Sequence, residues 1–197
     1  MDNSFFTISG SGTSLFKDRG SKFFGFAIPI LNVDDVKPAL EKIAEEHPTA
    51  RHVCYAYLVG INGEQYRAND DGEPNGSAGL PILNQIKSKE VTNVLVAVVR
   101  YFGGTKLGVS GLINAYKEAA KEALSQTKVV ERVPTSTIRI QFPHSITGAV
   151  ERLVRQSNWK IASQNFGQDC RWSIETPVSE SENARSLFGA IPGLSFY

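Results

Sequence analysis

The pattern of apolar and polar residues is strongest between Val94 and Leu124. Six consecutive apolar residues, Val94 to Val99, predict a strand that is covered on both faces, because a half-exposed strand alternates with polar residues. From Leu112 the apolar residues recur at helical spacing, and lysine and glutamate occupy the positions between them. We therefore expect a central strand followed by a helix that packs on the same sheet.

Shorter patterns of the same kind precede and follow this unit. The dipeptide Asn62-Gly63 is preferred in type I′ turns, so we expect an antiparallel hairpin around it. Ser9 to Ser14 is rich in glycine and serine and is expected to be a flexible connector. Further strands are predicted over residues 5–8, 22–30, 51–60, 64–68 and 128–133, and helices over residues 34–47 and 77–88.

Pro134 marks the expected boundary of a second domain. Strands are predicted over residues 137–142, 159–166, 170–176 and 194–197, with helices over residues 145–156 and 179–188, the second opened by a capping box at Ser179 to Glu182. This order, βαββαβ, is that of the split-βαβ, ferredoxin-like arrangement. We expect an α+β protein with an N-terminal domain over residues 1–133 and a C-terminal domain over residues 134–197.

Composition narrows the class of protein. The chain has 197 residues and a formal net charge of +1, which excludes a globally basic nucleic-acid binder but allows local basic patches. Cys54 and Cys170 each lie in an apolar-alternating segment and are expected to be buried free thiols in a reducing compartment. The sequence shows neither a signal segment nor an apolar run of membrane-spanning length, so we expect a cytoplasmic protein with no membrane partner.

A glycine-rich loop lies between the central strand and its helix. Four glycines within nine positions allow left-handed backbone dihedrals, and the following helix begins with free N–H donors and a positive dipole end. Lys106 in this loop would suit a phosphate, although the glycines could equally serve only to turn the chain. A P-loop is excluded because Val109 occupies the lysine position, and no Rossmann pattern is present.

Two further segments carry candidate cations. Lys17, Arg19 and Lys22 alternate with aromatic residues, a pattern that suits phosphate contacts and base stacking but also amphipathic strand packing. Arg100 ends the buried strand and must find water, a carboxylate or a ligand oxygen.

Two arrangements of Arg100 are open. If the neighbouring loops meet, Asp71 or Glu73 is its internal partner. Otherwise Arg100, Lys106 and Lys22 form one basic rim, which is the functional prediction from these residues.

The acidic loop from Asp70 to Gly76 allows a competing hypothesis. Asp70, Asp71 and Glu73 could hold Mg²⁺ for a hydrolase reaction. The structural interpretation is favoured, because Asp, Gly, Pro and Asn are turn-forming residues. We therefore expect no metal and no other cofactor.

The cysteine and histidine residues give no catalytic set. His52 and Cys54 share a face of one predicted strand and extend outward in parallel, so core packing is favoured over a nucleophile–base pair. His47 and His144 each lie beside a proline in predicted turns and are expected to be solvated. These residues therefore favour a role for the protein other than catalysis.

Three segments together resemble the IMPACT/YigZ family. They are the stretch from Val94 to Gly108, the segment Asp70-Asp-Gly-Glu-Pro-x-Gly-x-Ala-Gly79, and His52-x-Cys-x-Ala56. The resemblance covers residues 17–125, and the chain beyond residue 135 resembles the C-terminal extension of bacterial members. It implies an N-terminal domain similar to domain 2 of ribosomal protein S5 and a ferredoxin-like C-terminal domain similar to one in elongation factor G.

The resemblance also bears on function. Eukaryotic members look like translation regulators that compete for a kinase activator through an N-terminal RWD domain. Because this chain starts almost at the family core, we do not expect that contact here. A role in binding RNA or the ribosome remains, by analogy of fold.

The sequence thus supports a non-enzymatic, translation-associated binding protein. The residues expected to contact RNA are Arg100, Gly103, Gly104, Lys106 and Ser110, with Lys17, Arg19 and Lys22 as further contacts. The alternatives are the metal-dependent hydrolase and a protein-interaction module that recruits a partner through the ferredoxin-like sheet. The oligomeric state is left open.

Overall fold

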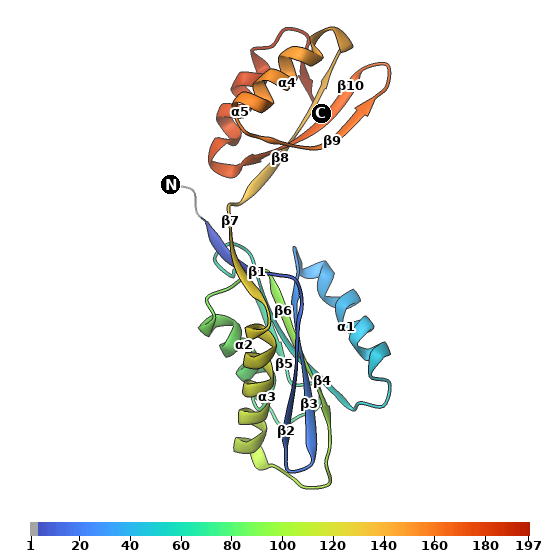
Figure 1. Cartoon of the computed structure of the whole chain (residues 1–197), viewed down its shortest axis with the longest axis vertical. Helices are drawn as coiled ribbons and strands as arrows, with labels where there is room; N and C mark the ends of the chain where they lie inside the picture. The colour runs from blue at the N-terminus through green and yellow to red at the C-terminus, as the bar shows by residue number, and fades with distance from the viewer. Residues whose placement is uncertain (1–3) are drawn as a thin grey trace. The chain divides into compact units, whose positions relative to one another are not determined.

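The computed structural model describes residues 4–197, which form two compact units, residues 4–132 and residues 133–197 (Figure 1). Residues 1–3, which the sequence assigns to the N-terminal domain, lie outside the described residues. Each unit has its own apolar core.

A five-stranded antiparallel sheet forms the centre of the N-terminal unit. Its strands are β2 (Gly12–Asp18), β3 (Ser21–Pro29), β4 (His52–Val59), β5 (Gln65–Asn69) and β6 (Val94–Tyr101), in the order β2-β3-β6-β4-β5. β6 is the middle strand, and its residues from Val94 to Arg100 are all buried. The central strand predicted from six consecutive apolar residues is confirmed.

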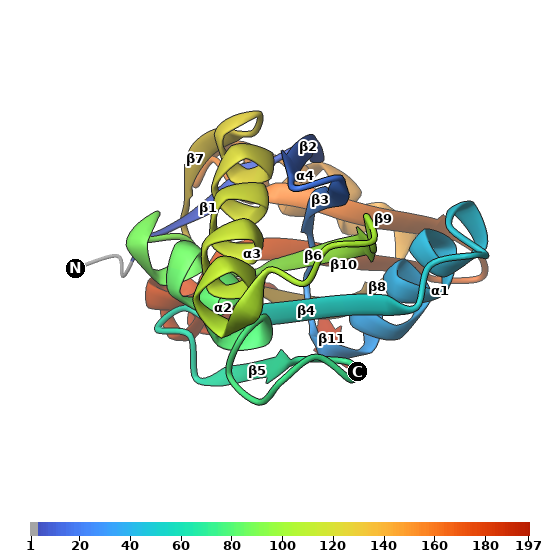
Figure 2. The same ribbon diagram turned by 90° about the horizontal axis from the view of Figure 1, so that it is seen from below.

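Helices cover both faces of this sheet, as Figure 2 shows. The helices are α1 (Val36–Glu46), α2 (Gly79–Ser88) and α3 (Gly108–Ser125). α2 and α3 pack on the face that carries Val96 and Val98, and Ile43 of α1 packs on the opposite face with Ala97 and Val99. Because consecutive strand residues point to opposite faces, the unbroken apolar run serves both cores.

The segment Ser9 to Ser14 is not a flexible connector, which corrects the expectation from its composition. Gly12 begins β2, and a Cβ at this position would overlap the backbone oxygen of Ala123 in α3. The Ser14 hydroxyl donates a hydrogen bond to the backbone oxygen of Ala119, 2.7 Å away. The small residues therefore let an edge strand pack closely against a helix.

The hairpin between β4 and β5 forms as predicted, but its turn differs. The Gly63 N–H donates to the Gly60 oxygen at 3.1 Å, and both glycines have positive φ. Asn62 does not have positive φ, whereas a type I′ turn requires it at both central residues. The turn therefore spans residues 60–63 with Ile61 and Asn62 at its centre, and Gly63 alone of the dipeptide has a positive φ.

Two strands outside the main sheet pair with each other. β1 (Phe5–Ser9) and β7 (Lys128–Arg132) form an antiparallel two-stranded sheet, with Phe5 opposite Arg132 and Ser9 opposite Lys128. Both strands are predicted from the sequence. Ile8 on β1 is buried in the core of the N-terminal unit.

The C-terminal unit has the predicted element order βαββαβ. Its elements are β8 (Thr135–Phe142), α4 (Thr147–Gln156), β9 (Lys160–Phe166), β10 (Cys170–Pro177), α5 (Ser181–Gly189) and β11 (Ser195–Phe196). The four strands are antiparallel neighbours in the order β11-β8-β10-β9. Trp172 and Phe188, both fully buried, belong to its core.

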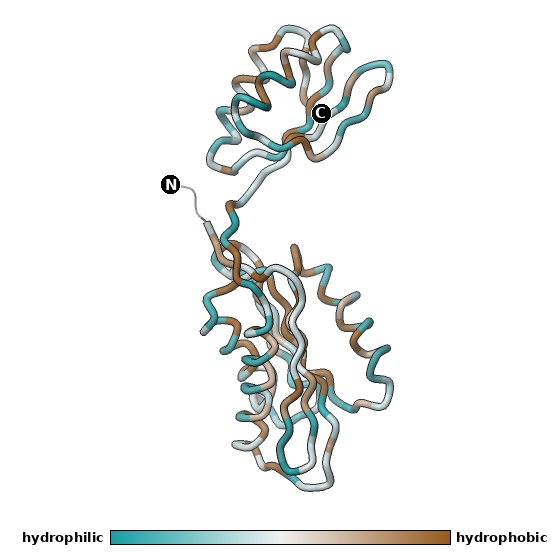
Figure 3. Tube along the Cα trace, viewed as in Figure 1, coloured by the Kyte–Doolittle hydropathy of each residue, from teal (hydrophilic) through white to brown (hydrophobic). Residues whose placement is uncertain are grey.

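The chain is thus of the α+β class, with helix and strand in both units. Figure 3 shows the apolar strands at the centre of the N-terminal unit and the hydrophilic end of the β2–β3 hairpin. Among residues 4–197, no helix is both long enough and apolar enough to cross a membrane.

Candidate nucleic-acid interface

Two loops meet at one end of the five-stranded sheet. They are the β2–β3 turn at Arg19 and Gly20, and the loop between β6 and α3. A Cβ at Gly103 would overlap the backbone of Gly20 and Ser21, and the Gly103 N–H donates to the Ser21 hydroxyl at 3.1 Å. Gly103 therefore holds the two loops together, and its amide is used within the protein.

Apart from Leu107, which is buried in the core, the rest of the glycine-rich loop faces solvent. Gly104 has a φ of +89°, and a Cβ there would meet nothing within 4 Å. Lys106 and Ser110 are exposed, and Ser110 lies in the first turn of α3, which begins at Gly108. The left-handed dihedral expected of the loop is confirmed at Gly104, and the positive end of the α3 dipole lies beside the Lys106 side chain.

A cleft of about 700 Å³ lies beside this loop. The residues that give it its chemical character are Arg51, His52, Glu73, Arg100, Phe102 and Lys106. Arg51 and Lys106 are exposed cations, and the Phe102 side chain is 59% exposed. The cleft therefore presents positive charge and the exposed Phe102 ring to solvent.

A buried ion pair lies in the wall of the cleft. Arg100 Nη1 lies 2.6 Å from Glu73 Oε1, and the two side chains are 9% and 4% exposed. The Tyr116 hydroxyl donates to the same carboxylate oxygen at 2.8 Å, and its burial raises the pKa of Tyr116. Glu73 is confirmed as the internal partner of Arg100, so Arg100 lies beneath the surface rather than on an exposed rim.

Asp70 fixes the start of α2. Its Oδ1 accepts hydrogen bonds from the N–H groups of Ala78 at 2.9 Å and Gly79 at 2.8 Å, and its Oδ2 accepts from Gly76 at 2.9 Å. Burial alone would raise the pKa of Asp70, but the three N–H donors outweigh it and lower that pKa. This carboxylate therefore satisfies donors that the helix itself leaves free.

The three acidic side chains of this loop have separate partners. Asp71 Oδ2 accepts from the Val53 N–H at 2.6 Å, while Glu73 binds Arg100 and Asp70 binds the start of α2. Among residues 4–197, no three His, Cys, Asp or Glu side chains lie close enough together to hold a metal ion. The three carboxylates therefore bind different partners, and the loop forms the turns that its composition predicts.

His52 and Cys54 do not form a catalytic pair. The Cys54 thiol donates to the Asp70 backbone oxygen at 2.9 Å, and His52 Nδ1 bonds to the Asp71 backbone oxygen at 2.7 Å. Burial raises the pKa of Cys54 to about 12, so the thiol stays protonated at neutral pH. The predicted packing role of Cys54 is confirmed.

The predicted basic residues divide over the two faces of the sheet. Lys22 pairs with Lys17 on β2 and with Tyr101 on β6, so these three side chains share the α1 face. Arg100 precedes Tyr101 on the same strand and points to the opposite face. Lys22 and Arg100 therefore do not form one rim, and Tyr101 and Phe102 separate the two groups of cations.

A second hollow, of about 500 Å³, lies on the Lys22 side. Its lining residues are Gly20, Lys22, Phe24, His47, Tyr101 and Phe102. We call it the aromatic hollow. Tyr101 and Phe102 also line the first cleft, so the two depressions adjoin at these residues.

Sequence reasoning missed three residues of this region. His47 is not fully solvated as expected, because it is partly buried and its Nδ1 lies 3.0 Å from the Tyr101 hydroxyl. Its position depends on how α1 packs on the sheet, for which the sequence gives no signal. Arg51 and Phe102 could have been found from the sequence. Arg51 is a cation at the start of a predicted strand, and Phe102 is an aromatic residue at the start of the glycine-rich loop.

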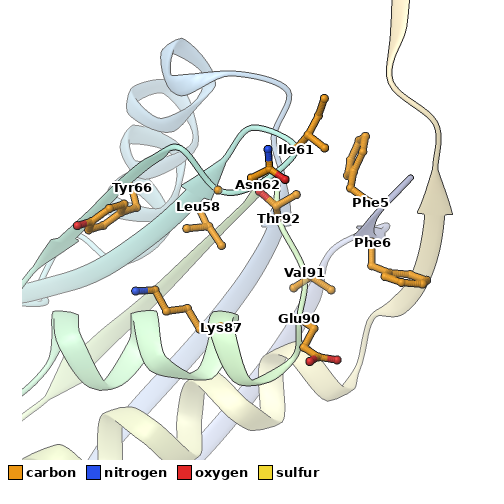
Figure 4. A pocket seen from close by; sticks show the side chains of 11 residues that line it. Phe5, Phe6, Leu58, Ile61, Asn62, Tyr66, Lys87, Glu90, Val91 and Thr92 are labelled. Carbon is orange, nitrogen blue, oxygen red and sulfur yellow. The ribbon is translucent and has the colours of Figure 1, made fainter. Parts of the chain in front are cut away.

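A third pocket, of about 460 Å³, lies at the opposite end of β6 (Figure 4). Phe5 and Phe6 from β1 lie on one side of it, and Tyr66 from β5 lies on the other. Lys87 of α2 has its Nζ 5.2 Å from the centre of the Tyr66 ring, and Glu90 supplies an opposite charge. This pocket is largely apolar and provides control positions for tests of the first two.

Fold and site together define a two-unit α+β protein whose N-terminal unit gathers cations around exposed loops. The model of the Impact N-terminal domain matches residues 19–124, which include both loops and the acidic segment. The chain belongs to the IMPACT family, as its resemblance to that family indicated.

Named relatives extend the match beyond this domain. IMPACT family member YvyE of Bacillus subtilis is 32% identical over 182 residues, which cover 92% of this chain and 83% of the relative. IMPACT family member YigZ of Escherichia coli is 35% identical over 151 residues, which cover 75% of this chain and 74% of the relative. A crystal structure of a hypothetical protein aligns with a TM-score of 0.74 and 27% identity, over 98% of this chain and 96% of that chain.

Proposed function

We propose that this protein is a non-enzymatic, translation-associated protein that binds single-stranded RNA, free or within the ribosome, at the loop end of its N-terminal unit. The observation that carries the proposal is the exposed Phe102 with cations on both sides of it. Membership of the IMPACT family supports the association with translation, because its eukaryotic members look like translation regulators. RNA binding is supported by the exposed cations and the aromatic ring at this end of the unit.

Positive charge is concentrated at this end of the unit. The exposed cations there are Lys17, Arg19, Lys22, Arg51 and Lys106. The whole chain carries a formal net charge of only +1, so this group is a local excess rather than part of a general one. Such a patch attracts phosphates and releases their counterions on binding.

An exposed aromatic ring among cations suits a single strand better than a duplex. Phe102 presents a π face to solvent, and unpaired bases stack on such rings whatever their identity. Lys22 and Lys106 line the two depressions that adjoin at Phe102, so phosphates on either side of a stacked base have a cation within reach. The arrangement favours contacts with backbone and base faces, with little dependence on sequence.

Binding of a labelled single-stranded RNA octamer, followed by fluorescence anisotropy, tests this proposal. The variant Lys22→Ala with Lys106→Ala removes two exposed cations, and we expect its affinity to fall at least tenfold. The control is Lys87→Ala with Lys89→Ala, which removes the same charge at the opposite end of β6. Equal affinities of the two double variants would contradict the proposal.

Co-sedimentation with ribosomal subunits separates RNA contacts from protein contacts. We expect the Lys22 and Lys106 double variant to lose co-sedimentation and the control to retain it. An association that is unchanged in both variants would favour the alternative of a protein-interaction module.

A further inference from the structure

We infer that the aromatic hollow is a pocket for one unpaired nucleobase, with the adjoining cations binding the phosphates on either side of it. This inference rests on the proposed RNA-binding function and deepens it, because it assigns a base-binding subsite to one face of the sheet. Four of the six lining residues carry aromatic rings: Phe24, His47, Tyr101 and Phe102.

Three of these rings form a packed wall. The Phe24 ring lies 5.2 Å from the His47 ring and 5.7 Å from the Tyr101 ring, measured between ring centres. His47 and Tyr101 are 5.8 Å apart between ring centres and are joined by the 3.0 Å contact between Nδ1 and the hydroxyl. Because each ring contacts the other two, the wall is held in place before any ligand enters.

Phe102 differs from these three rings because its side chain is 59% exposed. It lines the hollow without any ring contact to Phe24 or His47 among those found in the described residues. The Arg100 guanidinium carbon lies 5.7 Å from the centre of the Phe102 ring, so a planar ligand can stack on the ring face opposite Arg100 without displacing it. The volume of about 500 Å³ lies within the range of small-molecule sites, so one base and its sugar fit.

The charges around the hollow favour an anionic aromatic ligand over an apolar peptide. Lys22 lines the hollow, Lys17 lies directly opposite it on β2, and Arg19 is in the adjoining turn. Asp18 is the one carboxylate within this hairpin, so the cations exceed it. Aromatic walls with a positive edge match a nucleotide within a strand, whose base is planar and whose linkages are negative.

The nearby cleft does not share these properties. It shares Tyr101 and Phe102 and has its own cations, Arg51 and Lys106, but Glu73 and Arg100 neutralise each other in its wall. The rings that pack against Tyr101, Phe24 and His47, line the aromatic hollow and not this cleft. We therefore assign the base to the aromatic hollow and phosphate contacts to both depressions.

The test compares two octamers of equal length and charge on the full chain: single-stranded RNA, and an oligomer of tetrahydrofuran spacers that lacks bases. Base stacking predicts that the wild-type protein binds the RNA about five to a hundred times more tightly. Phe102→Leu and His47→Ala should each lower affinity for the RNA and leave affinity for the spacer oligomer unchanged. Tyr66→Leu, which removes an exposed aromatic ring from the third pocket, is the matched control.

A 2-aminopurine within the RNA gives a second readout. We expect its fluorescence to be quenched on binding to the wild-type protein and to the Tyr66→Leu variant, and less so with Phe102→Leu. Phe102 is exposed, so its replacement should leave the fold intact, which circular dichroism checks.

Different outcomes overturn different claims. Equal, salt-sensitive binding of both octamers, unaffected by Phe102→Leu and His47→Ala, would overturn the base pocket and leave RNA binding standing. Absence of binding to either octamer would overturn the proposed function, and the base pocket with it.

Discussion

At the scale of single residues, the acidic loop shows how similar side chains take different roles. Asp70 begins a helix, Asp71 binds a strand N–H, and Glu73 neutralises Arg100. The sequence presents them as one cluster of carboxylates. Only the fold separates them, because their partners come from α2, β4 and β6.

The Arg100–Glu73 pair should contribute strongly to stability. Arg100→Met leaves the Glu73 carboxylate buried without its cation, so we expect a loss of about 3–5 kcal/mol in the free energy of unfolding. Tyr116→Phe removes one hydrogen bond to the same carboxylate and should cost less, about 1.5–3 kcal/mol. Hydrogen exchange of β6 and α3 peptides in urea measures both. If Arg100→Met lowers the free energy of unfolding by less than Tyr116→Phe does, the Arg100–Glu73 pair does not have this role.

Asp70 should make the stability of the N-terminal unit depend on pH. Its pKa is lower in the folded protein than its ordinary value of 3.8, so its stabilising charge is present above that pH and is lost as pH falls through the folded pKa. Asp70→Asn should therefore cost about 1 kcal/mol at pH 7 and progressively less in acid.

Unfolding of both proteins between pH 7 and pH 2, followed by hydrogen exchange of α2 peptides, measures this difference. Parallel stability profiles for the wild type and Asp70→Asn would show that the carboxylate is not the source of the pH dependence.

At the scale of elements, two neighbouring glycines of the glycine-rich loop differ in their surroundings. Gly103 is architectural, because a Cβ there overlaps the backbone of Gly20 and Ser21. Gly104 has an open surface and a positive φ. The two glycines are adjacent in the sequence, yet only the partner loop distinguishes them.

Gly103→Ala should force the two loops apart. We expect a loss of stability and weaker RNA binding, because Lys22 and Lys106 would no longer flank Phe102 in the same way. The control is Gly148→Ala in α4, where a Cβ meets nothing within 4 Å and alanine should stabilise the helix by about 0.5–1 kcal/mol. Thermal unfolding and RNA anisotropy measure both effects, and unchanged binding by Gly103→Ala would contradict the role of the loop contact.

Elements with strong periodicity could be predicted, whereas those that depend on a neighbour could not. The run from Val94 to Val99 identifies the central strand because only a doubly covered strand tolerates it. β2 begins in a stretch of glycine and serine that resembles a linker, since close packing against α3 decides its conformation. His47 was misjudged for the same reason, because α1 brings it against the sheet.

At the scale of the whole molecule, the candidate interface belongs to one unit and the tryptophans to the other. Trp159 and Trp172 both lie in the C-terminal unit, and the Trp159 indole N–H donates to Glu180 at 2.6 Å. Tryptophan fluorescence therefore reports on the C-terminal unit, while RNA contacts are expected in the N-terminal one. RNA binding is therefore followed with the label on the RNA, and folding of the C-terminal unit is followed with tryptophan fluorescence.

The sequence identifies the basic residues, but the predicted rim of Arg100, Lys106 and Lys22 is wrong. One group of cations consists of Lys17, Arg19 and Lys22, and a second consists of Arg51 and Lys106. Arg100 belongs to neither group, because it is buried in an ion pair with Glu73. Alternation along β6 explains the division, since Arg100 and Tyr101 must point to opposite faces. Register between strands, which the sequence does not reveal, determines which cations share a face.

The central claim is that phosphates bind the cations at the loop end of the N-terminal unit. The most direct measurement is the slope of log affinity against log salt concentration for single-stranded RNA, with the wild type and the variant Lys22→Ala with Lys106→Ala. Each lost phosphate contact should reduce the slope by about 0.7, so we expect a reduction of about 1.4 in the double variant. A slope near zero for the wild type, or identical slopes for the two proteins, would contradict the claim.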